Sequence, residues 1–155
     1  MCYRNFDEQD ARKELLLGVQ IEEPSVFLNW DIKEDVFVEK FVNADNFREH
    51  GYFVGNIIFL GQHCNMGVSF SGTVDKISFG RDDYSGEDGL IKSFHTFQTA
   101  LEKAFGSPTK RKPVLDHFES CVWDISDEIK IRHYVMDRFG LAEYLYIQKL
   151  VEGEA

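Results

Sequence analysis

Long hydrophobic runs, proline and paired cysteines are scarce in this sequence. No run of 18 apolar residues occurs, so we expect no transmembrane helix. Only 3 of the 155 residues are proline and 12 are glycine, which excludes a collagen-like chain or a proline-rich linker. The amino-terminal residues contain no apolar segment typical of a secretory signal. We therefore expect a protein of the reducing cytoplasm with no membrane partner.

The sequence also lacks the spacing patterns of common metal, nucleotide and catalytic sites. Its three cysteines, Cys2, Cys64 and Cys121, are odd in number and form no C-x-x-C pair, which argues against a disulfide framework or structural zinc. No two of its five histidines are spaced as H-x-H or H-x-x-x-H. Nucleotide-binding, hydrolase and kinase signatures are absent too. We predict no cofactor, no metal and no catalytic residue.

Charge of one sign dominates the sequence. It has 27 acidic and 17 basic side chains, for a formal net charge of −10. Residues 1–50 contain 12 of the acidic and 6 of the basic residues, which places −6 of that charge in the first third. Nucleic-acid binding depends on cations that contact phosphates, so we expect no nucleic-acid partner. A basic protein partner is favoured, because opposite charges speed association.

The composition is that of one folded domain spanning residues 1–155. Hydrophobic residues make up 43% and aromatic residues 14%, enough for a core of its own. One amphipathic helix is predicted over residues 93–105, because Phe94, Phe97, Leu101 and Phe105 form a single stripe. We expect Ser93 to be its N-cap. Gly106 and Pro108, which follow Phe105, are typical of a helix end.

Alternating apolar residues predict strands on both sides of this helix. The expected strands before it span about residues 26–30, 52–60, 66–70 and 74–79. Residues 33–47 suit either a helix or a strand, residues 80–89 read as a loop, and residues 110–116 read as a connection. A three-stranded meander is expected over about 121–125, 129–135 and 141–151. The prediction is an α+β fold with an antiparallel sheet of about 6–8 strands and the helix packed on one face.

Two acidic segments are candidate partner-binding sites. The first contains Glu34, Asp35 and Glu39, with Trp30 and Phe37 nearby, and carboxylates interleaved with aromatics suit a Lys- or Arg-rich surface. The alternative is an ordinary solvated face with two core aromatics. The second segment offers an aromatic anchor among carboxylates, and its candidate residues are Asp82, Asp83, Tyr84, Glu87 and Asp88. Its spacing does not match a calcium-binding EF-hand loop.

A cysteine–histidine site is the alternative that would make the protein an enzyme. His63 and Cys64 are adjacent in a strand and should point to opposite faces, so Cys64 would need His95, His117 or His133 as its base. His133 lies on an apolar strand face. This favours a core histidine over a pH sensor.

Three functional hypotheses follow. The first is a non-catalytic inhibitor or immunity-type protein that neutralises a basic protein such as a bacterial toxin. The second is a small enzyme that uses Cys64, a histidine or the acidic loop. The third is a structural module in which surplus aromatics form a homodimer.

Overall fold

The computed structural model describes residues 8–81 and 86–150. Within them lie three helices: α1 (Glu8–Leu17), α2 (Glu34–Lys40) and α3 (Gly86–Phe105). The strands are β1 (Gly18–Ile21), β2 (Val26–Asn29), β3 (Asp45–Arg48), β4 (Gly51–Phe59), β5 (Gln62–Ser71), β6 (Thr73–Gly80), β7 (Lys110–Leu115), β8 (Phe118–Asp124), β9 (Ile129–Asp137) and β10 (Leu141–Lys149). The expected α+β fold with an antiparallel sheet is confirmed.

Eight strands form one antiparallel sheet in the order β3-β4-β5-β6-β10-β9-β8-β7. Its centre is the pairing of β6 with β10, in which Ile77 lies opposite Ile147. On each side of this pair the strands follow one another as a meander. β1 and β2 form a separate two-stranded sheet.

The chain therefore contains two units of the same kind. In the first, α2 precedes the meander β3–β6, and in the second, α3 precedes the meander β7–β10. The two meanders join through their last strands. The sequence did not establish this repeat, because residues 33–47 suit either a helix or a strand and the first helix was too weak a signal, whereas the strand order makes the correspondence plain.

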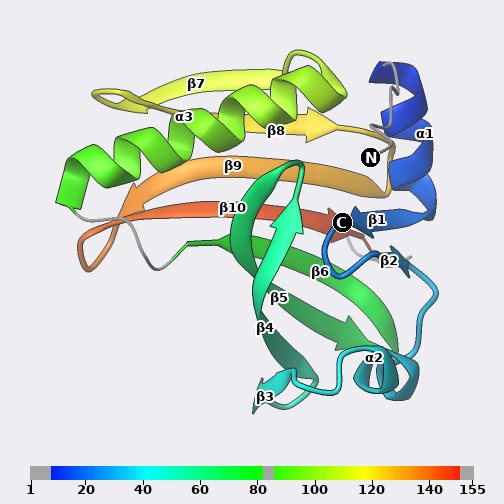
Figure 1. Ribbon diagram of the computed structural model, residues 1–155. Helices are drawn as coiled ribbons and strands as arrows, with labels where there is room; N and C mark the ends of the chain where they lie inside the picture. Colours follow the sequence, from blue (N-terminus) through cyan, green and yellow to red (C-terminus); the bar gives the residue numbers. More distant parts are fainter. Residues whose placement is uncertain (1–7, 82–85, 151–155) are drawn as a thin grey trace.

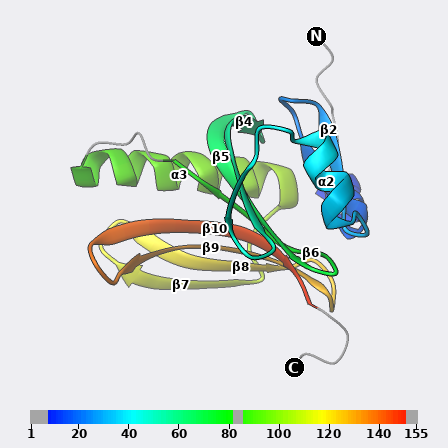
Figure 2. The same ribbon diagram turned by 90° about the horizontal axis from the view of Figure 1, so that it is seen from below.

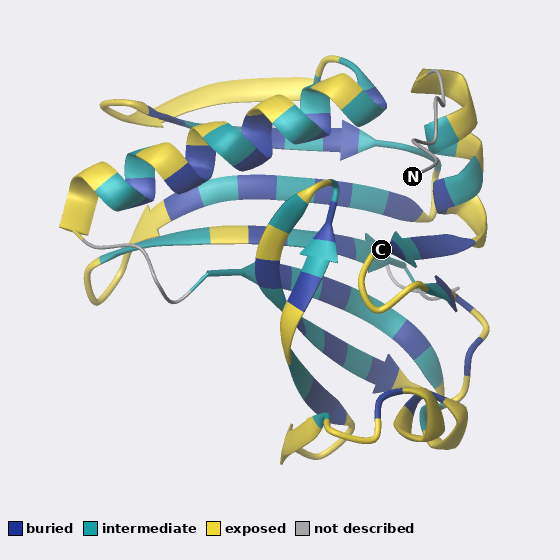
Figure 3. Ribbon diagram, viewed as in Figure 1, coloured by how far each residue is buried: buried dark blue, intermediate teal, exposed yellow. Residues whose placement is uncertain are grey.

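One face of the sheet carries the core (Figures 1 and 2). α3 packs against β8, β9 and β10, and Phe37 of α2 packs against Tyr52 and Phe70 at the other end. Dark bands of buried residues alternate with less buried ones along the strands in Figure 3, as the two-residue period of a sheet with one covered face requires. Trp30 and Trp123 are both buried in this core.

Two local predictions were wrong. α3 begins at Gly86, seven residues before the expected N-cap Ser93, which instead lies buried inside the helix. The glycines at 86 and 89 made the first turn resemble a loop. The end was predicted correctly, since Gly106 follows Phe105 with a φ of 82° and its N–H bonds the carbonyl of Glu102.

The second error concerns residues 110–115, which form strand β7 and not a connection. The expected three-stranded meander is thus four-stranded. β7 is an edge strand whose residues are all exposed, so it lacks the buried alternation that reveals a strand. Its Pro113 and cations are typical of an edge that resists further pairing.

Candidate functional site

The predicted residues of the first acidic segment, Glu34, Asp35 and Glu39, all lie on α2. Glu34 accepts a hydrogen bond from the Tyr52 hydroxyl at 2.5 Å, and its other oxygen lies 2.7 Å from His50 Nδ1. These contacts tie the first turn of α2 to the β3–β4 turn and to the start of β4. The hydrogen bonds from Tyr52 and His50 lower the pKa of Glu34, and the same carboxylate raises the pKa of His50. Asp35 and Glu39 are exposed.

Trp30 and Phe37, the aromatics expected among these acids, are not on the surface. Phe37 is completely buried, and Trp30 is 1% exposed and donates its indole N–H to the carbonyl of Leu15. Both aromatics therefore belong to the core and are not available to a partner.

Other apolar side chains take their place on the surface. Val36 and Val38 of α2, Val42 after it and Phe47 of β3 are between 38% and 78% exposed. We call these four residues, with the exposed acids Asp35, Glu39 and Asp45, the α2–β3 surface. The sequence did not reveal it, because residues 33–47 suited either a helix or a strand; once the structure buries Phe37 and Phe41 at a helical spacing of four, Val36 and Val38 lie to either side of that buried stripe.

The second predicted acidic segment is only partly visible. Asp82, Asp83 and Tyr84 lie outside the described residues, whereas Glu87 and Asp88 are exposed in the first turn of α3. That end of α3 lies at the opposite side of the molecule from α2 (Figure 1). The described parts of the two segments therefore do not form one continuous surface.

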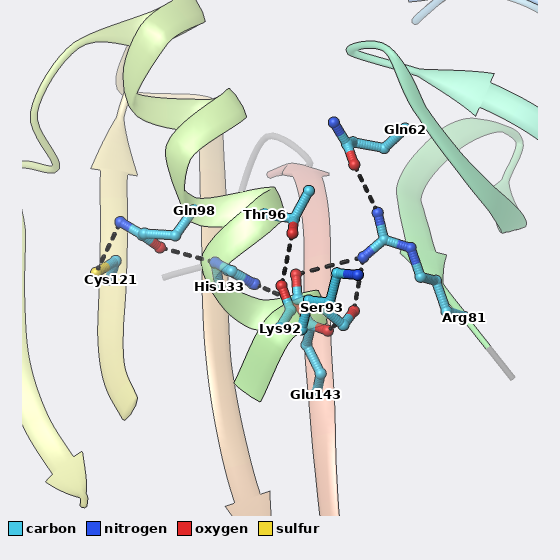
Figure 4. Close-up of polar contacts among 9 residues, drawn as sticks. All are labelled: Gln62, Arg81, Lys92, Ser93, Thr96, Gln98, Cys121, His133 and Glu143. Carbon is cyan, nitrogen blue, oxygen red and sulfur yellow. Dashed lines mark hydrogen bonds and ion pairs between the residues drawn. The ribbon is translucent and has the colours of Figure 1, made fainter. Parts of the chain in front are cut away.

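A partly buried chain of polar side chains connects α3 to the sheet (Figure 4). Arg81, just after β6, donates to the Ser93 hydroxyl at 2.7 Å, and Ser93 donates to Glu143 of β10 at 2.6 Å. The second Glu143 oxygen lies 2.6 Å from Nε2 of His133 on β9. Arg81 also donates to Gln62 at 2.8 Å. The chain thus joins β5, β6, β9 and β10 to one face of α3.

His133 is fully buried and stacks on Phe94, with ring centroids 4.2 Å apart. Its Nδ1 lies 2.8 Å from Gln98 Oε1. Two oxygen neighbours would favour a charged ring, but removal from water outweighs Glu143 and lowers the pKa of His133. The neutral ring then donates through one nitrogen only. His133 is a core histidine, as the sequence favoured.

These contacts do not form a nucleophile with its base. Ser93 donates to Glu143, and His133 contacts the far side of that carboxylate, so the imidazole is not placed to take the Ser93 proton. Burial raises the pKa of the Cys64 thiol to about 12 and that of Cys121 to about 11. Neither is a thiolate near neutral pH. His63 is exposed while Cys64 is buried, as expected for adjacent strand residues.

A groove of about 1570 Å³ lies between α3 and the elements that face it, α1, β1 and the β4–β5 turn. Lys92, His95 and Lys103 line it from α3. Glu14, Glu22 and Glu23 line the opposite wall. One wall of the groove is basic and the other is acidic, and no buried polar side chain among the described residues lines it. The lining therefore does not identify a class of ligand.

The described residues contain no group of three or more His, Cys, Asp or Glu side chains placed to hold a metal ion. No helix in residues 8–81 and 86–150 is both long and apolar enough to cross a bilayer.

Comparison with known proteins yields little. No family model matches the chain, and no curated protein matches it. Among solved structures, the chain is similar to a crystal structure of a DUF4309 family protein (YjgB) from Bacillus subtilis, with a TM-score of 0.47 and 11% identity over 90% of each chain. A likeness this slight carries no argument about function.

Proposed function

We propose that this protein is a non-catalytic binding domain that docks a basic protein partner on its α2–β3 surface. The observation that carries the proposal is that Val36, Val38, Val42 and Phe47, all within residues 36–47, are each exposed and have acidic neighbours along the chain. Protein interfaces commonly have an apolar centre and a polar rim. An apolar centre excludes water, and a rim of carboxylates selects a partner rich in Lys and Arg.

The distribution of charge supports the sign of the partner. Residues 8–50 contain 11 acidic and 5 basic side chains, a balance of −6. They build α1, β1, β2 and α2, which follow one side of the molecule, and β3 at the edge of the sheet (Figure 1). A field concentrated in this way orients a basic partner before contact and raises the association rate.

The chemistry of the buried residues favours binding over catalysis. The two thiols in the described part of the chain have raised pKa values, and the polar chain around His133 is occupied by its own hydrogen bonds. An inhibitor or immunity-type protein that neutralises a basic toxin in the cytoplasm is the functional class we favour. Free Cys64 and Cys121 suit that reducing compartment.

The experiment is a pull-down from the native host with tagged protein, followed by association kinetics with the recovered partner. Glu39→Lys combined with Asp45→Lys reverses two exposed rim charges without placing a cation at the start of α2. We expect this variant to associate roughly tenfold more slowly at low salt and to respond less to added salt. Phe47→Ser should instead speed dissociation, because Phe47 belongs to the apolar centre.

The matched control is Asp127→Lys with Glu128→Lys, which makes the same charge change in an exposed turn between β8 and β9. Glu87→Lys with Asp88→Lys tests whether the start of α3 takes part. If the Glu39/Asp45 variant and the control associate at equal rates, the α2–β3 surface is not the docking site. Recovery of no basic protein at low salt would contradict the proposed function itself.

A further inference from the structure

The face of the sheet opposite α3 is open across β6, β10, β9, β8 and β7. α1, α2 and α3 all lie on the other side, and no described element covers this outer face (Figure 2). Strand alternation identifies its side chains. Ile131 and His133 are buried toward α3, so Lys130, Arg132 and Tyr134 point outward. Tyr144 and Tyr146 point outward from β10 by the same argument.

The charge of this face is opposite to that of the whole chain. Five basic side chains belong to it by register, namely Lys76, Lys110, Lys112, Lys130 and Arg132. Only two acids in these strands share the face, Asp75 and Asp124. Asp75 accepts a hydrogen bond from Ser69 at 2.5 Å, and the Asp124 carboxylate lies 3.5 Å from Lys130 Nζ. A chain with a net charge of −10 thus presents a local excess of three positive charges here.

Three tyrosines form a fixed cluster among these cations. The rings of Tyr134 and Tyr144 are stacked with centroids 5.2 Å apart, and Tyr146 lies edge-on to Tyr134 at 6.3 Å. Lys76 Nζ lies 4.2 Å above the ring of Tyr146. Because the rings already hold one another, a partner that binds them causes little further loss of side-chain freedom. Tyrosine and arginine are also the side chains that most often dominate binding energy.

We propose that this outer face is a second docking surface, and that it binds an acidic protein segment. The proposal uses other strands than the α2–β3 surface and does not depend on it. The cations complement carboxylates of the partner. The ring faces of Tyr134 and Tyr144 are stacked on each other, and Lys76 covers one face of Tyr146. A nucleic-acid base would bind by stacking on a free ring face, and these contacts already occupy a ring face of each tyrosine. A carboxylate needs no ring face, because it binds the cations and the tyrosine hydroxyls.

The size of the face suits a protein partner. Its five strands, at a spacing of about 4.8 Å, span roughly 20 Å across the strands. Strands of six to nine residues give a comparable length along them. A face of this extent approaches the lower range of a standard protein interface.

The experiment is an NMR titration of the isotopically labelled full chain with a decapeptide of alternating Glu and Ala at low salt. We expect the amide signals of β6, β9 and β10 to shift, with those of Tyr134, Tyr146 and Lys76 among them. Removing two charges from the face with Lys76→Gln and Arg132→Gln should weaken binding about tenfold. The control Lys13→Gln with Lys92→Gln makes the same charge change at exposed positions on α1 and α3 and should leave binding within about twofold.

Two comparison ligands test whether the bound partner must be an acidic protein segment. A decapeptide of alternating Lys and Ala should not shift these signals, and a ten-residue oligothymidylate should bind at least tenfold more weakly than the Glu peptide. Shifts confined to other elements, or equal affinity for the oligothymidylate, would overturn the proposal. If the double variant does not fold, Tyr144→Ser replaces it, because Tyr144 is 38% exposed. Unchanged binding by the variant that folds would also overturn it.

Discussion

At the scale of single residues, two histidines show how position decides charge. His133 is buried between Phe94 and the sheet, and burial lowers its pKa. His50 is exposed beside Glu34 and Glu49, and the hydrogen bond to Glu34 raises its pKa. The sequence identified His133 as a core residue from the apolar face on which it lies. Glu34, which pairs with His50, and Gln98, which contacts His133, come from distant parts of the chain, so spacing alone did not reveal them.

The first prediction is the order of these two titrations. In NMR spectra of the imidazole nitrogens, we expect His50 to titrate above the ordinary value of about 6.5 and His133 below it. A reversed order would contradict the burial argument. Glu34→Gln should bring the pKa of His50 back toward 6.5 and leave His133 unchanged, which separates the two causes.

The same shifts fix the signs of two contributions to stability. Because the pKa of His133 is lowered by folding, its contribution is present above the unfolded value of about 6.5 and is lost as the pH falls through the folded value. The pair of His50 with Glu34 acts in the opposite direction. Its contribution is present below about 6.5 and is lost as the pH rises through the raised pKa of His50, and it is lost again at low pH as the pH falls through the lowered pKa of Glu34.

At the scale of elements, the strength of the hydrophobic pattern determined what could be predicted. The stripe of Phe94, Phe97, Leu101 and Phe105 revealed α3, and all four side chains are buried in the structure. The segment 33–47 stayed ambiguous because its apolar residues are dense enough for either period. Tertiary contacts of Phe37 with Tyr52 and Phe70 accompany its division into α2 and β3.

The second prediction concerns the attachment of α3. Phe97 is completely buried, and its ring packs under the Arg81 guanidinium at 4.0 Å. Phe97→Asp removes this packing and buries a carboxylate, so we expect a loss of about 3–5 kcal/mol or more in the free energy of unfolding. Urea denaturation measures it. Thr99→Asp, on the exposed side of the same helix, should change stability by about 0.5 kcal/mol or less. Equal stability of the two variants would show that α3 is not held by its stripe.

At the scale of the whole molecule, two α–β4 units share one core. A single cluster of buried residues contains Trp30, which lies beside the first unit, and Trp123 of the second. The pairing of β6 with β10 carries the main sheet across the junction. A continuous core makes separate unfolding of the units unfavourable, because either unit alone would expose apolar surface.

The third prediction is one cooperative transition. The chain has two tryptophans, so Trp30→Phe and Trp123→Phe each leave a single fluorescent reporter in one part. We expect both variants to show the same midpoint by fluorescence as by circular dichroism in urea. A midpoint that differs between the two signals of one variant would show that the units unfold separately.

The sequence by itself determined the class of fold, the end of α3 and the sign of the overall charge. Each of these follows from local periodicity or composition, which a single chain displays directly. Only the tertiary structure decided that Phe37 turns inward while Val36 and Val38 stay exposed. It also decided that β7 completes the sheet, and that cations gather on the outer face of an acidic protein. These features depend on which distant strands pair, and strand pairing brings together residues that no short spacing relates.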